Sequence, residues 1–282
     1  MEAVDAEVQT TIDEALREWR QGDCMLAEDS FTFRIAPDAP LTNEATAAAA
    51  AEEKDAEGSV IGLAILSQTC DIVRKCNGRP YVEVCPLVEV DEDQLHEIER
   101  CRHPNYAYIP GIAEHHLVAD LDRVMTVEKP VVAKWDRTVG CLDDSHARRL
   151  SLALARKRAR MAFPNDFDSF VAPLRKRMSS KHDRESDEGR ALKALREIRV
   201  RAGPSWDADH VELMFWFIRD ENQPRFEEQG WEEFLDAWLA RIPASGRFGT
   251  VDGVVLTLDD LTAREYVESD MLDLDYLSSR AE

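Results

Sequence analysis

The sequence predicts an α+β protein with two domains: a small, strongly bent β-barrel with flanking helices, then a smaller α+β domain with an antiparallel sheet. Three observations predict this. Many short apolar segments separated by turns fill the first half, whereas fewer and longer segments around one main helix fill the second. Residues 179–189 contain no apolar side chain. We therefore expect domains at 1–178 and 190–282, joined by a linker at 179–189.

The first domain is organised around residues 60–71, where seven residues with almost no polar member run into Ser-Gln-Thr-Cys-Asp. Such a run is typical of a strand buried on both faces. A turn at Asn77-Gly78 follows, and residues 81–90 form a second, valine-rich strand. Pro86 within that strand indicates a sheet edge or a bulge, because proline cannot donate to a neighbouring strand.

The segments before this stretch predict one helix and two strands. Apolar residues recur at helical spacing over 3–20, and Gln21-Gly22 ends the helix. A short strand then begins at Gly22-Asp23, and an alternating strand covers 31–35. Residues 36–58 are rich in Pro, Ala and Glu without an apolar period, which predicts a partly mobile surface insertion.

The rest of the first domain should contain short strands and three helices. A helix is expected over 91–102, and it is followed by strands over 106–110, 117–121, 124–127 and 131–135. Asp143 or Asp144 caps a basic helix that runs to Met161, and a shorter helix over 170–178 has Pro173 near its first turn.

The second domain should contain strands over 198–202 and 211–218, a helix over 231–242 and a short helix over 262–266. Asp252-Gly253 between two apolar runs predicts a hairpin. The tail over 268–282 is acidic with interleaved apolar residues, a pattern that suits an extended segment docked on its own domain.

The charge is strongly acidic but uneven. The net charge is −21, yet residues 146–201 carry 16 basic and 7 acidic side chains. The candidate binding residues of this basic region are Arg149, Arg156, Lys157, Arg158 and Arg160. They could bind phosphate or a partner, or pair with carboxylates of their own chain, and the acidic remainder favours the second use.

The composition predicts a cytoplasmic protein with free thiols and no membrane segment. The acidic N-terminus has no signal-peptide pattern, and no run of about 18 apolar residues exists. The six cysteines lack disulfide or zinc spacing. His96, Cys101, His103, His115 and His116 are irregularly spaced, so they could form a metal site only if the fold brings them together. No phosphate-binding glycine loop is present, so we expect neither a metal nor a cofactor.

An enzyme is the alternative that the residue types allow. Cys70 would be the nucleophile, His115 or His116 the base, and Asp71 or Asp120 the orienting carboxylate. A thiolate needs a nearby imidazole to take its proton. The competing interpretation is that Cys70 is a small residue at a strand end and that the histidines lie in a solvated loop.

The first domain resembles the PemK/MazF-like toxin barrels, which are SH3-like. The resemblance rests on Gly22-Asp23, on the apolar strand 60–68, on Val82-Glu83-Val84-Cys85-Pro86-Leu87, and on 118–127 with the helix from Ser145. It covers roughly half of the chain. The family implies RNA cleavage by an arginine paired with a serine or threonine.

The chain departs from the family at both catalytic places. Gly58 and Ser59 stand where the arginine is expected, and Val88 and Glu89 stand where the serine or threonine is expected. Arg79-Pro80 is similar to the family's Arg-Pro pair but belongs to a different strand. The resemblance therefore implies the barrel without the cleavage.

These observations predict a cytosolic bacterial protein that binds other macromolecules. The barrel and its basic helix would form the contact surface for a protein partner, with nucleic acid as a second class of ligand for the helix. The resemblance implies a setting in stress response, toxin–antitoxin systems or anti-phage defence. The alternatives are an endoribonuclease of the toxin-barrel class and a hydrolase that uses Cys70.

Overall fold

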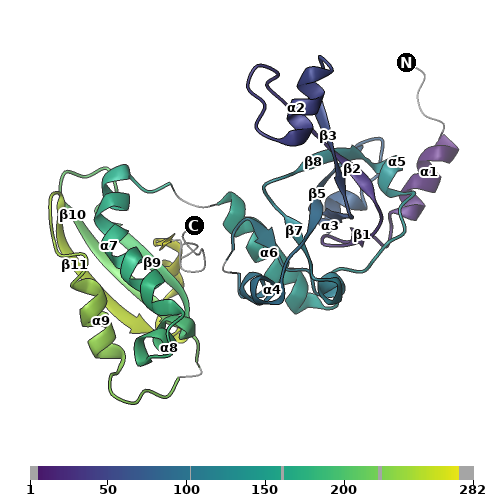
Figure 1. Ribbon diagram of the computed structural model, residues 1–282. Helices are drawn as coiled ribbons and strands as arrows, with labels where there is room; N and C mark the ends of the chain where they lie inside the picture. Colours follow the sequence, from purple (N-terminus) through teal and green to yellow (C-terminus); the bar gives the residue numbers. More distant parts are fainter. Residues whose placement is uncertain (1–5, 102, 160–161, 222–223, 273–282) are drawn as a thin grey trace. The chain divides into compact units, whose positions relative to one another are not determined.

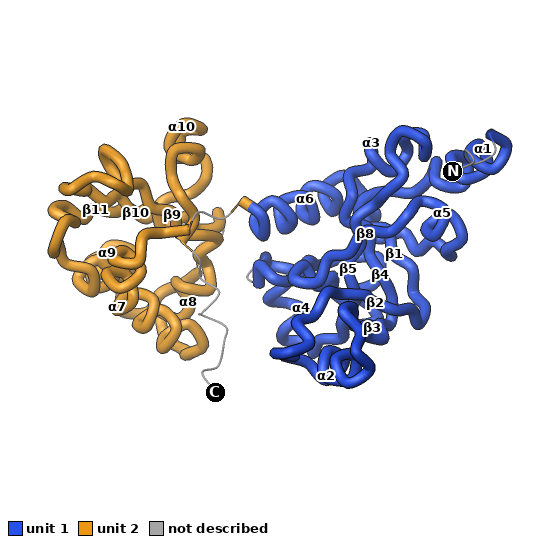
Figure 2. Tube along the Cα trace, turned by 90° about the horizontal axis from the view of Figure 1, so that it is seen from above, with its two compact units in different colours: residues 1–158 blue, residues 159–282 orange. Residues whose placement is uncertain are grey.

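The computed structural model describes residues 6–101, 103–159, 162–221 and 224–272. The chain divides into unit 1, residues 1–158, and unit 2, residues 159–282 (Figure 1, Figure 2). Both units combine helices with antiparallel strand pairs, so the predicted α+β class is confirmed. The division falls directly after Arg158, earlier than the boundary at 178 that the sequence predicts.

Unit 1 contains short strands between short helices. In chain order they are α1 (Ala6–Ala15), β1 (Cys24–Met25), β2 (Asp29–Arg34), α2 (Asn43–Ala50), β3 (Asp55–Val60), β4 (Leu63–Ile65), α3 (Thr69–Ile72), β5 (Tyr81–Glu89), α4 (Glu92–Glu99), β6 (Tyr106–Ala107), the 3₁₀ helix η1 (Pro110–His115), β7 (Leu117–Asp120), β8 (Met125–Glu128), α5 (Lys129–Val132) and α6 (Asp144–Arg158).

The strands of unit 1 do not close into the predicted barrel. The main sheet has the order β1-β4-β5-β7-β6, with β8 also on β5, while β2 and β3 form a separate two-stranded ribbon. Closure requires the end strands to pair with each other. Among the described residues, β1 and β6 remain at opposite ends of the sheet. The barrel prediction was therefore wrong, although the antiparallel pairing it assumed is present.

Strand β5 is the centre of the main sheet, and Pro86 marks a change of partner. On one edge Leu87 donates its N–H to Gly62 O, 2.9 Å away. The opposite edge of β5, which the backbone of Pro86 faces, pairs with β8 up to Val84 and with β7 from Leu87 onward. A proline between the two partners leaves no ladder hydrogen bond unmade, so Pro86 marks a change of partner within a central strand rather than the sheet edge or bulge that the sequence predicts.

The apolar stretch at the centre of the sequence is divided between two strands. Val60 ends β3, the chain turns at Gly62, and Leu63–Ile65 forms β4. All three residues of β4 are buried. Leu63 and Ile65 pack into one core cluster and Ala64 into another, so burial on both faces is confirmed for β4.

The Gly22-Asp23 pair forms a buried corner. The Asp23 carboxylate accepts hydrogen bonds from Arg20 N (2.7 Å), Gly140 N (3.1 Å) and Arg137 Nε (2.6 Å). Gly140 packs so closely that a Cβ there would lie 1.8 Å from Gly22 O. The pair therefore joins the start of β1 to the segment that precedes α6.

Unit 2 is a four-stranded sheet with helices. Its elements are α7 (Asn165–His182), α8 (Asp187–Ala194), β9 (Leu195–Gly203), β10 (Val211–Arg219), α9 (Trp231–Leu239), β11 (Phe248–Leu256), the 3₁₀ helix η2 (Leu258–Asp260), α10 (Ala263–Val267) and β12 (Asp270–Leu272). The strand order is β11-β10-β9-β12. Of the acidic tail, β12 pairs with β9 of its own unit, and residues 273–282 lie outside the described residues.

The sheet of unit 2 is mixed rather than antiparallel, and the hairpin predicted at Asp252-Gly253 was wrong. Strand β11 pairs with β10 in parallel. Asp252 and Gly253 lie inside β11, and α9 provides the crossover that parallel neighbours need. A Cβ at Gly253 would lie 3.2 Å from Leu239 Cδ2, so the glycine allows close packing of α9 on the strand.

The linker predicted at 179–189 was also wrong, because α7 continues to His182 and α8 begins at Asp187. Glu188 replaces the apolar contacts that the segment lacks. Its carboxylate accepts two hydrogen bonds from Arg177, at 2.7 and 3.1 Å, and one from Trp238 Nε1 at 3.1 Å. A buried, fully bonded carboxylate thus connects α7, α8 and α9.

Asp187 provides a pH-dependent contact in unit 2. It accepts hydrogen bonds from the backbone N–H groups of Glu227, Glu228 and Gln229 and from Arg190, and these donors lower its pKa from 3.8 to about 2. The stability that the charged form contributes is complete above the ordinary pKa and is lost as the pH falls towards 2.

We therefore expect the amides of residues 227–229 to exchange hydrogen faster as the pH falls from 4 to 2, after correction for intrinsic exchange rates. Asp187→Asn is expected to show the fast exchange already at pH 6. Protection that stays constant down to pH 2 in the natural protein would contradict this role.

Candidate functional site

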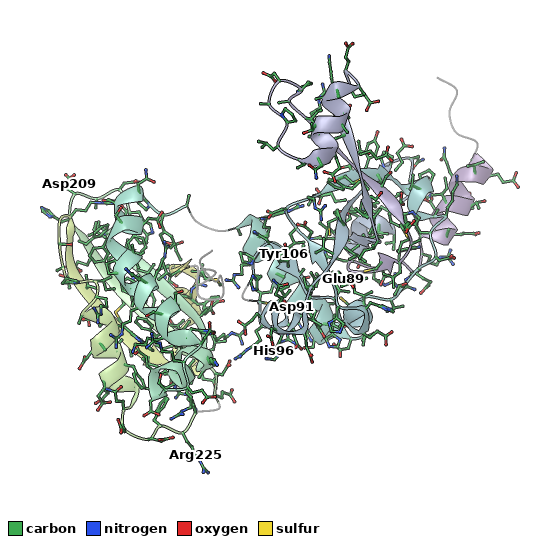
Figure 3. All side chains as sticks on the ribbon, viewed as in Figure 1. Glu89, Asp91, His96, Tyr106, Asp209 and Arg225 are labelled. Atoms are coloured by element: carbon green, nitrogen blue, oxygen red, sulfur yellow. The ribbon has the colours of Figure 1, made fainter. Side chains whose placement is uncertain are left out.

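The structure separates the residues of the predicted thiol–imidazole site. Cys70 is exposed on α3, and its Sγ donates only to Gln68 Oε1, 3.6 Å away. The carbonyl of His116 accepts a hydrogen bond from Val90 N, just past Glu89 at the end of β5 (Figure 3). The segment that leads to α3 contacts β5 near its start, where Leu66 N donates to the carbonyl of Glu83. The two candidates therefore leave opposite ends of β5.

The carboxylates proposed to orient the base are engaged elsewhere. The Asp71 side chain pairs with Arg74 at 3.4 Å. Asp120 accepts from Arg123 Nε at 2.7 Å and from Asp122 N at 2.9 Å. His115 Nε2 lies 3.7 Å from Glu114 Oε1. The hydrolase arrangement that the sequence predicts is not assembled.

The polar cluster after β4 stabilises the local backbone instead. Ser67 Oγ accepts from Glu83 N at 2.8 Å, and Thr69 Oγ1 accepts from Gln21 N at 3.1 Å. Behind α3, the fully buried Lys129 donates from Nζ to the carbonyls of Asp71 and Arg74. Burial lowers the pKa of Lys129. These contacts are those of a turn at a strand end.

The basic residues of α6 pair mainly with carboxylates of the same unit. Lys157 contacts Asp122, and Arg158 Nη2 lies 3.0 Å from Glu83 Oε2. Arg149 lies 3.9 Å from Glu99. Arg156 is likewise engaged, and Arg160 lies outside the described residues. The described part of α6 therefore does not present the unanswered basic stripe that phosphate binding would need.

The described residues contain no group of three His, Cys, Asp or Glu side chains that could hold a metal ion. All six cysteines are free thiols. In the same described part of the chain, no helix is long and apolar enough to cross a membrane.

A groove lies between β2 and β8 of unit 1. It has a volume of about 620 Å³. It is lined by all six residues of β2, by residues 124–127, and by Leu63, Val131 and Trp135. Successive side chains of a strand point to opposite faces. Because consecutive residues line the groove from both sides, each strand turns an edge towards it rather than a face.

The pairing register places unpaired backbone groups on these two edges. Within the described chain, β2 pairs only with β3, and β8 only with β5. Ile35 N donates to Lys54 O after β2, and Lys129 N donates to Pro80 O after β8. Antiparallel residues direct their N–H and C=O alternately to the two edges. The backbone N–H and C=O groups of Thr32 and Thr126 therefore point away from β3 and β5, respectively, and towards the groove.

The groove has a mixed lining, in which apolar side chains lie on the core side and Asp29, Ser30 and Arg34 add polar groups. Phe31 is buried, with Phe33 stacked beside it at a centroid distance of 6.0 Å. Met125, Val127 and Trp135 pack around the same core cluster. Ser30, Thr32 and Thr126 alternate with these residues along the two strands. Val124 and Val131 remain exposed at the rim.

The predicted surface insertion at 36–58 follows directly after β2, the strand that forms one wall of the groove. Residues 36–58 contain α2 and most of β3, and Figure 1 shows this segment projecting from unit 1. Thr42 caps α2 by accepting from Ala45 N at 3.1 Å, and Ala45 and Ala48 are buried. The alanine tract is thus the packed face of a short helix.

No protein-family model matches the chain, and no curated protein sequence matches it.

Proposed function

We propose that unit 1 is a protein-binding module that captures an extended segment of a partner protein as an added strand between β2 and β8. The observation that carries the proposal is the groove bounded by two strand edges. An extended segment placed there can bond to the free edge of β2 at Thr32 or to that of β8 at Thr126. Main-chain hydrogen bonds provide affinity in this mode, and pockets for alternate side chains provide specificity.

The charge of the chain supports a protein rather than a nucleic acid as partner. The net charge is −21, and Arg149, Lys157 and Arg158 of α6 pair with carboxylates of the same unit. Like charge opposes the approach of a phosphate backbone. We infer a setting in bacterial stress response or anti-phage defence, in the cytoplasm, from the sequence resemblance to PemK/MazF-like proteins alone, which residues such as Gly22 and Asp23 carry.

The test selects octapeptides from a random phage-displayed library on the full chain and measures the affinity of the selected sequences. Bound peptides are expected to alternate apolar and polar residues. Thr126→Pro removes an N–H that faces the groove and leaves the β5 ladder intact. We expect it to weaken binding roughly tenfold or more.

Thr126→Val is the matched control, because it changes the side chain and keeps the N–H. It is expected to retain binding, and both variants are expected to keep the thermal unfolding midpoint. The proposal is wrong if selection yields no peptide that binds in solution, or if Thr126→Pro binds as tightly as Thr126→Val.

A further inference from the structure

The two faces of a strand added at the groove would meet different surroundings. Paired residues of neighbouring strands point to the same side of a sheet. Phe31 and Phe33 of β2 and Met125 and Val127 of β8 point inward to the core. Every second residue of the captured segment therefore meets apolar side chains.

The intervening residues of the segment would meet carboxylates. Thr32 pairs with Glu57 on β3, so Glu57 lies on the same outer face as Thr32, one strand behind the β2 edge that lines the groove. Glu128 lies on the same outer face as Thr126, two residues along β8. Both glutamates are exposed, and neither forms an ion pair within the described residues.

The other outer-face carboxylates near the groove are already neutralised. Asp55 pairs with Arg34 at 3.1 Å, and Glu83 pairs with Arg158 at 3.0 Å. Glu57 and Glu128 therefore remain as one unanswered negative charge on each side of the groove. Residues 28–60, which include the whole ribbon, add a wider field, because they carry eight acidic side chains and two basic ones.

We propose that the segment bound in the groove alternates apolar residues with lysine or arginine. This inference rests on the proposed strand capture and specifies its ligand. The apolar residues fill the space above Phe31 and Met125. The cationic residues face outward, where their long side chains reach Glu57 and Glu128. An acidic segment would meet the same carboxylates as like charges, which opposes binding.

Two synthetic peptides of equal length test the inference on the full chain: acetyl-(Lys-Val)₄-amide and acetyl-(Glu-Val)₄-amide. The lysine peptide is expected to bind at least tenfold more tightly. Its affinity is expected to fall as NaCl rises from 50 to 500 mM, because salt screens exposed charges. Equal affinities, or a preference for the glutamate peptide, would overturn the inference and leave strand capture standing. If neither peptide binds while library-selected peptides do, the inference is likewise overturned; if no peptide of any kind binds, strand capture itself fails.

Variants of the two carboxylates locate the effect. Combined Glu57→Gln and Glu128→Gln is expected to weaken the lysine peptide roughly threefold to tenfold, the range for two exposed ion pairs. Glu52→Gln is the matched control, because this exposed glutamate belongs to the same 36–58 segment but lies in the turn before β3, outside the strands. The inference is overturned if the control weakens the lysine peptide as much as the double variant does.

Discussion

The Asp23→Ala variant is expected to lose about 3–5 kcal/mol from the free energy of unfolding of unit 1. Asp23 is 1% exposed and accepts hydrogen bonds from two backbone N–H groups and from Arg137. Truncation leaves these donors without an acceptor inside a closely packed corner.

The measurement is the urea dependence of hydrogen exchange at the amides of Leu63–Ile65, which lie in β4 and report on unit 1 alone. Asp122→Ala is the control, because the Asp122 side chain is 53% exposed and pairs only at the surface with Lys157. The control variant is expected to lose less than about 1 kcal/mol from the free energy of unfolding of unit 1. If Asp23→Ala costs no more than the control, the corner does not stabilise unit 1.

This prediction also concerns the resemblance to toxin barrels. Gly22-Asp23 is one of the features that carries the resemblance, and the structure gives it a complete role in packing. A residue pair that closes a corner is selected by geometry, whatever the protein binds. The pair therefore supports an argument about local structure and adds nothing to an argument about RNA cleavage.

The class and many of the strands could be predicted because they depend on local signals. Strand β5 follows from its valine-rich run, whereas the change of partner at Pro86 was not predicted, because the missing N–H alone indicated an edge or a bulge. Barrel closure could not be predicted in the same way. It depends on which strands meet at the ends of the sheet, and the sequences of β1 and β6, two residues each, contain no information about that.

The candidate sites show the same limit. Cys70, His115 and His116 have the right chemistry, but their separation is set by the register along β5. The groove was missed because it exists only between strands far apart in the sequence. The sequence contains only a faint sign of the groove, in that Phe31 and Phe33 alternate with polar residues, as Met125 and Val127 do. The sequence does not show that one edge of each strand has no partner within the described residues.

Glu188→Ala is expected to lower the free energy of unfolding of unit 2 by about 3–5 kcal/mol, because it leaves Arg177 and Trp238 without their shared acceptor. Glu185→Ala, an exposed change in the same apolar-free segment, is expected to cost less than about 1 kcal/mol. The check is the loss of amide protection at β10 residues such as Phe215 and Phe217 in urea.

The comparison separates two interpretations of one segment. A linker would tolerate both changes equally, since neither side chain would be needed for packing. A segment held by a buried carboxylate responds to Glu188 alone. Equal effects of the two substitutions on the free energy of unfolding would favour the interpretation of the segment as a linker. A difference of several kcal/mol would show that a stretch without apolar residues belongs to the core of unit 2, because an ion pair and an indole hydrogen bond replace the contacts that apolar side chains usually make.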